Sequence, residues 1–252
     1  MDYDSLPDPR RVWTGAPGSR EEGLGRLVLL TPDVVARAAK CIKTGRRVGM
    51  NWDMNKLDVA NFNRAPTQHH IVSLLGGAAY DDVYIFNPQQ SSQWDGLRHF
   101  SAPFPTPNEP DRRLFYGGVT SKEIEDRNNT RIGLQHWAAR AYAEGAFCWI
   151  TFVTLNAIRS SIAPFPTTLS LFIRFKTVRR SKASRFAAET CFLGEGEAGV
   201  PGVFLHEYLL AGWGVPVGEL FDLEELSRIS EEEKRWEFFV TAAPLNMPGG
   251  RI

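Results

Sequence analysis

Short strand-like runs alternate with helix-like runs along this chain, and this alternation most limits the folds that it can adopt. Runs typical of strands cover residues 26–30, 46–52, 69–75, 81–86 and 236–246. Helical patterns cover residues 31–45, 120–128, 131–140, 203–214 and 222–235. Because helices that alternate with strands pack on the faces of a sheet, the sequence predicts an α/β or α+β domain.

The segment 31–45 carries the strongest local signals for a helix. Thr31 is a favourable N-cap, Pro32 fits the first turn, and Gly45 is a typical stop signal. We therefore predict a helix between Thr31 and Gly45.

Composition limits the partners and the compartment. The 29 basic residues balance the 29 acidic residues, so no net field attracts nucleic acid or an anionic membrane. Cys41, Cys148 and Cys191 are widely spaced and include no CxxC pair, which is typical of a reducing compartment. No signal pattern or membrane-spanning run is present, so we expect a cytoplasmic protein with a small-molecule substrate.

Histidine is the usual proton carrier at neutral pH and a frequent metal ligand, so each histidine is a candidate. His69 and His70 open an apolar strand-like run, and His136 lies beside Trp137 on a helical run. Structural roles are favoured for these three.

His99 is the best candidate for a functional histidine. Asp95 precedes it by four residues and Gln93 by six, so one loop or strand end can direct all three side chains into one pocket. His206 lies on an apolar helical run, and its functional role depends on Glu219, which follows the turn GWGVPVG.

Several motifs in a fixed order resemble the cyclase family that includes the bacterial kynurenine formamidases, in its fungal branch. They are QSSQWDGLRHF (90–100), FYGGVTSKEI (115–124), RIGLQHWA (131–138), FLHEYLLAGWGVPVGELFDLEEL (204–226) and FFVTAAPLN (238–246). The likeness covers roughly residues 5 to 140 and 200 to 248.

The resemblance implies a fold and an activity. The fold is a single compact domain of the swivelling β/β/α type, with a mixed sheet and flanking helices, over residues 26–252 after an N-terminal arm at 1–25. The activity is that of a metal-dependent hydrolase that acts on an amide or a cyclic small molecule. The family also implies a homo-oligomer, such as a dimer.

The resemblance also implies site residues. The family's first metal-binding element reads H-x-x-x-H-x-D, and the catalytic histidine follows four residues later. Asp95 and His99 match the last two of these positions, whereas Gln89 and Gln93 stand where the family has ligand histidines.

The distal ligands of the family fall on His206 and Glu219. With glutamine oxygens in place of imidazoles the implied site is rich in oxygen, which favours manganese or magnesium over zinc.

The segment 141–183 does not resemble the family. Read one base out of frame, the codons of Phe147 to Ile150 yield Leu-Leu-Asp, as in the family's GRGVLLDY run. We hypothesise that this segment is translated out of frame and is also shortened. The alternative is an insertion that belongs to this lineage.

Three functions remain open. The first is a metal-dependent hydrolase that resembles kynurenine formamidase. The second is an inactive or degenerate member that acts at most as a ligand-binding protein. The third is a metal-free enzyme that uses Asp95 and His99 as an acid–base pair.

Sequencing the transcript across the codons for residues 135–200 tests the frame hypothesis. We expect an extra base or a missing exon that restores the GRGVLLDY run and a later strand. A transcript that encodes these 252 residues as written would instead mean that the frame shift is genuine, and we would then expect a poorly folded, inactive chain.

Overall fold

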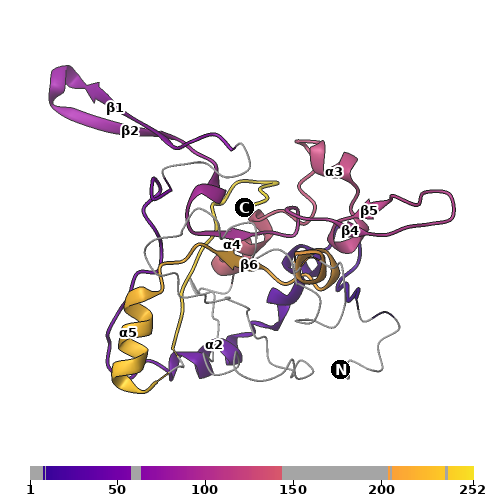
Figure 1. Ribbon diagram of the computed structural model, residues 1–252, viewed down its shortest axis with the longest axis horizontal. Coiled ribbons are helices and arrows are strands. Elements are labelled where there is room, and N and C mark those ends of the chain that lie inside the picture. Colours follow the sequence, from indigo (N-terminus) through magenta and orange to yellow (C-terminus); the bar gives the residue numbers. More distant parts are fainter. Residues whose placement is uncertain (1–7, 9, 58–63, 144–203, 205, 236–237) are drawn as a thin grey trace.

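The computed structural model of this chain describes residues 8, 10–57, 64–143, 204, 206–235 and 238–252. Helices and small antiparallel sheets alternate along these segments, as expected for an α/β fold (Figure 1). The α- and π-helices among them are α1 (Arg20–Leu24), α2 (Pro32–Ala39), α3 (Ser121–Glu125), α4 (Gln135–Ala143), the π-helix η9 (Glu207–Gly212) and α5 (Glu224–Glu233).

Six short strands pair two by two within the described residues. They are β1 (Gln68–Leu74), β2 (Ala79–Ile85), β3 (Gln93–Asp95), β4 (Ala102–Pro103), β5 (Arg113–Leu114) and β6 (Val217–Glu219). The antiparallel pairs are β1 with β2, β3 with β6 and β4 with β5. The mixed sheet and the swivelling arrangement remain predictions. The anomalous segment 141–183 lies outside the described residues, apart from its first three residues at the end of α4.

The predicted start of α2 is confirmed. The Thr31 hydroxyl accepts a hydrogen bond from the Val34 N–H at 3.4 Å, and Pro32 is the first residue of the helix. The helix ends at Ala39, earlier than predicted. The N–H groups of the next three residues bond to carbonyls three residues back, as in a tightened last turn.

Three predicted strands are wrong. Residues 25–29 form a 3₁₀ helix. Leu27 within it and Leu24 and Leu30 at its two ends recur every third residue and are buried. Residues 46–52 contribute only one bridge, from Asn51 to Phe221. Residues 238–246, the described part of the last predicted strand, contain no regular element.

The other predicted elements are present. The β1–β2 hairpin matches its two predicted strands. Helix α3 begins with a capping box, in which Thr120 and Glu123 bond to each other's backbone N–H. The helical prediction for 203–214 corresponds to the π-helix η9, and that for 222–235 to α5.

The described residues form two apolar clusters. The larger joins the N-terminal segment to residues 97–137 and contains Leu24, Leu27, Leu30, Leu97, Tyr116, Val119, Ile124, Ile132, Leu134 and Trp137. The smaller lies around η9 and β6 and contains Leu209, Leu210, Val215 and Val217. None of the helices in the described part of the chain has the length and apolar character that crossing a membrane requires.

A buried ion pair connects α1 to the turn before α4. The Glu22 side chain is 2% exposed, and Arg131 donates to its two oxygens at 2.6 and 2.8 Å. Arg131 also donates to the Gly117 carbonyl at 2.9 Å and to Glu123 at 3.3 Å. One guanidinium therefore holds three separate segments together.

The substitution Glu22→Gln should lower the free energy of unfolding by about 3 kcal/mol, because it removes the buried carboxylate that accepts two hydrogen bonds from Arg131. Urea denaturation measures this loss. Glu225→Gln on α5 is the matched control, since Glu225 pairs with Arg228 on the exposed surface. An equal shift in the two variants would contradict the role given to the buried pair.

Candidate metal centre

Strands β3 and β6 build the centre of the site. Their antiparallel pairing places Gln93 opposite Glu219 and Asp95 opposite Val217. Val217 is buried in the smaller apolar cluster, and Trp94 packs edge-on against Phe221 with ring centroids 5.4 Å apart. Packing on both sides of the short ladder thus brings residues 93–95 next to residues 217–219.

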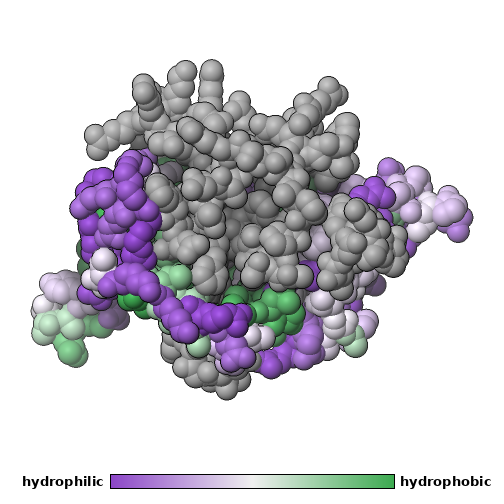
Figure 2. All heavy atoms as spheres, turned by 90° about the horizontal axis from the view of Figure 1, so that it is seen from below, coloured by the Kyte–Doolittle hydropathy of each residue, from purple (hydrophilic) through white to green (hydrophobic). Residues whose placement is uncertain are grey.

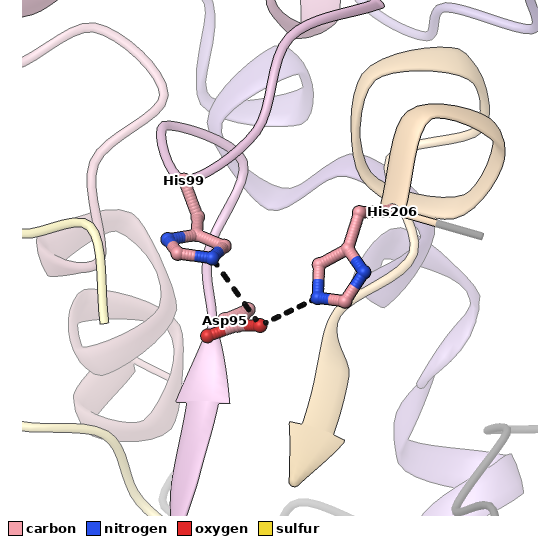
Figure 3. Close-up of side chains that lie close together, drawn as sticks. All are labelled: Asp95, His99 and His206. Carbon is pink, nitrogen blue, oxygen red and sulfur yellow. Dashed lines mark hydrogen bonds and ion pairs between the residues drawn. The ribbon is translucent and has the colours of Figure 1, made fainter. Parts of the chain in front are cut away.

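The carboxylate of Asp95 lies at the focus of the site and is completely buried. Its Oδ1 accepts a hydrogen bond from the Gln89 side-chain amide at 2.5 Å. Its Oδ2 lies 3.1 Å from Nε2 of His206 and 3.6 Å from Nε2 of His99 (Figure 3). One buried charge therefore faces two imidazoles and an amide.

A tight turn directs His99 back towards Asp95. The His99 N–H bonds to the Gly96 carbonyl at 3.0 Å, and the Gly96 N–H bonds to the Arg251 carbonyl at 2.8 Å. A Cβ on residue 96 would lie 2.8 Å from the Leu134 side chain and 2.9 Å from the Arg251 carbonyl oxygen. Only glycine fits this position without displacement of its neighbours.

Arg98 anchors the same turn through hydrogen bonds to the backbone. Its side chain is 1% exposed and donates to the carbonyls of Arg131, Ile124 and Glu123 at 2.8, 3.0 and 3.2 Å. These bonds satisfy carbonyl groups at the end of α3 and fix the backbone that carries His99.

His206 immediately precedes the π-helix η9. Its ring packs against those of Phe100 and His99, with centroids 5.3 and 5.8 Å away. The next residue, Glu207, is buried and pairs with Arg113 at 2.5 Å, which holds the start of η9 against β5. Because π-helical turns are common at functional sites, this local geometry agrees with a binding role for His206.

Glu219 completes the arrangement from β6. Its Oε1 lies 3.2 Å from Nε2 of His206, and its Oε2 accepts a hydrogen bond from the Gln93 amide at 3.1 Å. The site residues predicted from the sequence, namely Asp95, His99, His206, Glu219, Gln93 and Gln89, are therefore neighbours in space. Their individual roles remain predictions.

The other histidines lie elsewhere. His69 and His70 are exposed on the β1–β2 hairpin, where His69 bonds to Asp82. His136 lies on α4 and is half buried, against Gly23. Sequence reasoning missed Arg98 and Phe100. Both lie inside the motif QSSQWDGLRHF, but the burial of an arginine has no local sequence signal.

Burial lowers the pKa of His99 below its ordinary value of 6.5, and this is the largest influence on it. The Asp95 carboxylate opposes the shift, His206 reinforces it, Glu219 opposes it and Arg64 reinforces it. His99 is therefore neutral at neutral pH and can accept a proton.

The donor set fits a metal ion. Asp95, His99 and His206 each offer one ligand atom, and these atoms lie within 4.8 Å of one another. Near them, Oε1 of Gln93 is buried and has no hydrogen-bond partner among the described residues. A buried acceptor without a partner is unfavourable and can be satisfied by a cation. The three residues can thus hold a metal ion.

Removing His99 should change how stability depends on pH. Because its folded pKa lies below that of the unfolded chain, protonation favours unfolding. In chelator-treated protein, the stability of the native chain should fall relative to His99→Gln as the pH drops through about 6.5, its unfolded pKa. Urea titrations of both proteins across this range measure the difference, and parallel curves would rule it out.

Comparisons with known proteins identify the fold. No family model matches this chain, and no curated protein sequence matches it. A solved structure described as the crystal structure of a novel cyclase is 18% identical, with a TM-score of 0.59. The match covers 92% of this chain and 94% of that chain. The chain therefore shares the fold of a cyclase, and its Asp95–His99–His206 cluster can hold a metal ion.

Proposed function

We propose that this chain is a metal-dependent hydrolase of an amide or a cyclic small molecule, and that it belongs to the fungal branch of the cyclase family with kynurenine formamidase as its nearest named activity. The observation that carries the proposal is the convergence of two imidazoles on the buried carboxylate of Asp95. The cyclase fold and the motifs around these residues support the same assignment.

Within this cluster, Asp95 and His206 would hold the ion together with the neighbouring Glu219, and His99 would keep the proton-transfer role. Oδ2 of Asp95 and Oε1 of Glu219 both face Nε2 of His206, at 3.1 and 3.2 Å. Gln89 and Gln93 bind the remaining carboxylate oxygens and so orient both acids. A bound divalent ion polarises a substrate carbonyl and lowers the pKa of water, which is the chemistry that amide hydrolysis needs.

His99 would move the protons. Its Nε2 lies 3.6 Å from Oδ2 of Asp95, and its ring is 19% exposed, the largest opening towards solvent among the three residues of the cluster. Since its lowered pKa keeps the ring neutral, His99 can accept a proton from water and return it to the leaving amine.

The donor types narrow the choice of metal. Glutamine and carboxylate oxygens suit manganese and magnesium, whereas imidazole nitrogens suit zinc. Because oxygen donors outnumber imidazole nitrogens around the ion, we propose manganese or magnesium ahead of zinc.

The proposal also includes the domain organisation, the location and the oligomeric state that the family resemblance implies. Residues 26–252 would form one swivelling β/β/α domain with a mixed sheet, after an arm at 1–25, in a cytoplasmic homodimer. The likeness to the cyclase over 92% of the chain supports a single unit of this fold.

A second candidate is a catalytically inactive member that binds a small ligand in the same pocket. The specific observation in its favour is that Gln89 and Gln93 stand at positions where the family has ligand histidines. Their amide nitrogens point to the carboxylates and leave fewer nitrogen ligands for a metal.

The experiment combines metal binding with turnover of an aryl formamide. Purified, chelated protein is titrated with Mn²⁺, Mg²⁺ or Zn²⁺ by calorimetry, and formamide hydrolysis is then followed at saturating metal. We expect His99→Ala to retain the metal but to lose about 10²–10⁴-fold in kcat, as for a general acid–base residue. Asp95→Asn should lose both metal and activity, whereas its control, Asp111→Asn on an exposed loop, should lose neither.

The outcomes separate the candidate functions. Folded protein that neither binds metal nor hydrolyses the formamide would support the inactive member. Turnover that survives complete chelation would identify Asp95 and His99 as a metal-free acid–base pair. Either result would overturn the metal-dependent mechanism.

A further inference from the structure

The β1–β2 hairpin projects from the body of the molecule and is exposed along its length (Figure 1). Every residue of β1 is exposed, and so is every residue of β2 except Ala79. Many of these side chains are large and apolar, and they form the hydrophobic end of the left-hand projection in Figure 2. They are Ile71, Val72, Leu74, Tyr80, Val83, Tyr84 and Ile85, together with Leu75 in the turn between the strands.

An isolated apolar hairpin is expected to pack against another element. Two isolated antiparallel strands are only marginally stable in water, and independent stability requires a third strand or another packed element. Exposed apolar patches beyond a few hundred Å² are rare on monomeric proteins and mark interaction sites. The seven-residue ladder from Gln68–Ile85 to Leu74–Ala79 is nevertheless regular. Among the described residues, β1 and β2 pair only with each other, so we look for the partner of the hairpin on a second molecule.

The two edges of the hairpin differ in charge. The middle residue of β2 is Asp82, with Asp81 beside it, whereas the middle residue of β1 is Ile71. In β1 the flanking residues are His70 and Val72, and the strand has no carboxylate, lysine or arginine. Natural sheets protect exposed edges with charged residues, and here only the edge of β2 has this protection.

We propose that β1 pairs with β1 of a second copy of this chain, which makes a four-stranded antiparallel sheet in the order β2–β1–β1–β2. Full-length antiparallel pairing about a two-fold axis places Ile71 opposite Ile71 of the partner subunit. His70 then lies opposite the partner's Val72. This surface does not depend on the proposed catalytic function.

The sequence of β1 favours a second copy over another partner. A two-fold interface uses one surface twice, so every residue must be compatible with its symmetry mate. At the centre of β1 this requirement creates an apolar pair of Ile71 side chains, each 69% exposed in the single chain. The same operation on β2 would place Asp82 against the partner's Asp82, which is unfavourable.

The dimensions also suit two copies. A strand of seven residues is about 24 Å long, and alternate residues along its free edge direct N–H and C=O groups outward. Pairing satisfies these groups and covers the flanking apolar side chains. Because the hairpin projects beyond the rest of the described chain, its edge is reachable by another copy (Figure 1).

Substitution of Ile71, the residue next to the two-fold axis, by an acidic or a basic residue tests this arrangement. We expect native protein to sediment as a dimer, and Ile71→Asp and Ile71→Lys each to weaken dimerisation by about 100-fold or more, because like charges would then face each other. An equimolar mixture of the two variants should recover the dimer as a heterodimer. Val83→Asp and Val83→Lys on the outer strand are the matched controls and should dimerise alone.

Several results would overturn the proposal. One is a native protein that stays monomeric at its highest soluble concentration, and another is dimerisation of both Ile71 variants alone. A third is loss of the dimer in the Val83 variants only. Because residue 71 is exposed, circular dichroism should show the same overall fold in all variants. Residue 71 lies opposite Asp82 in the hairpin, so Ile71→Lys is the variant that adds no like charge within one chain. Amide hydrogen exchange provides a second measurement, since alternate amides of β1 should be protected in native protein and exchange faster in Ile71→Lys.

Discussion

The buried charge of Asp95 is the constraint on which the centre of this structure depends. An unpaired carboxylate in a protein interior is strongly unfavourable, so its surroundings must supply hydrogen bonds or a compensating charge. Gln89, His206 and His99 meet this need from three different segments. Nε2 of His206 lies 3.1 Å from Oδ2 of Asp95 and 3.2 Å from Oε1 of Glu219, so this nitrogen faces both acids. A cation held by the same groups would compensate the charge of the two carboxylates.

The scaffold controls this cluster through backbone groups. Arg98 binds the carbonyls at the end of α3, and the Arg251 carbonyl binds Gly96, so the turn that carries His99 is held on two sides. The second of these contacts comes from the C-terminal end of the chain. Segments far apart in the sequence thus set the position of the turn that carries His99. A loss of packing in either segment would displace the site even if none of the site residues changed.

The sequence correctly predicted the elements whose formation depends on neighbouring residues, such as helix caps and hairpin strands. Thr31 and Pro32 specify the start of α2, and alternating β-prone residues specify the hairpin. The prediction failed at residues 26–30 because strand propensity depends on context, and here leucines at every third residue favour a 3₁₀ turn against the core. The proximity of Asp95 and His99 followed from their spacing. The approach of His206 and Glu219 depends on the β3–β6 ladder, a contact across more than a hundred residues, and only the family resemblance predicted it.

The two glutamines determine which carboxylate oxygens of the site are available to a ligand. An amide cannot gain or lose a proton near neutral pH, so Gln89 and Gln93 present the same N–H donors in every protonation state. Gln89 occupies Oδ1 of Asp95, and Gln93 occupies Oε2 of Glu219. The other oxygen of each acid is left facing His206. Each glutamine therefore leaves one carboxylate oxygen available on each acid. These two oxygens, Oδ2 of Asp95 and Oε1 of Glu219, both lie next to Nε2 of His206. This geometry favours one cation and disfavours a pair, since a second ion would need the carboxylate oxygens that the amides already hold.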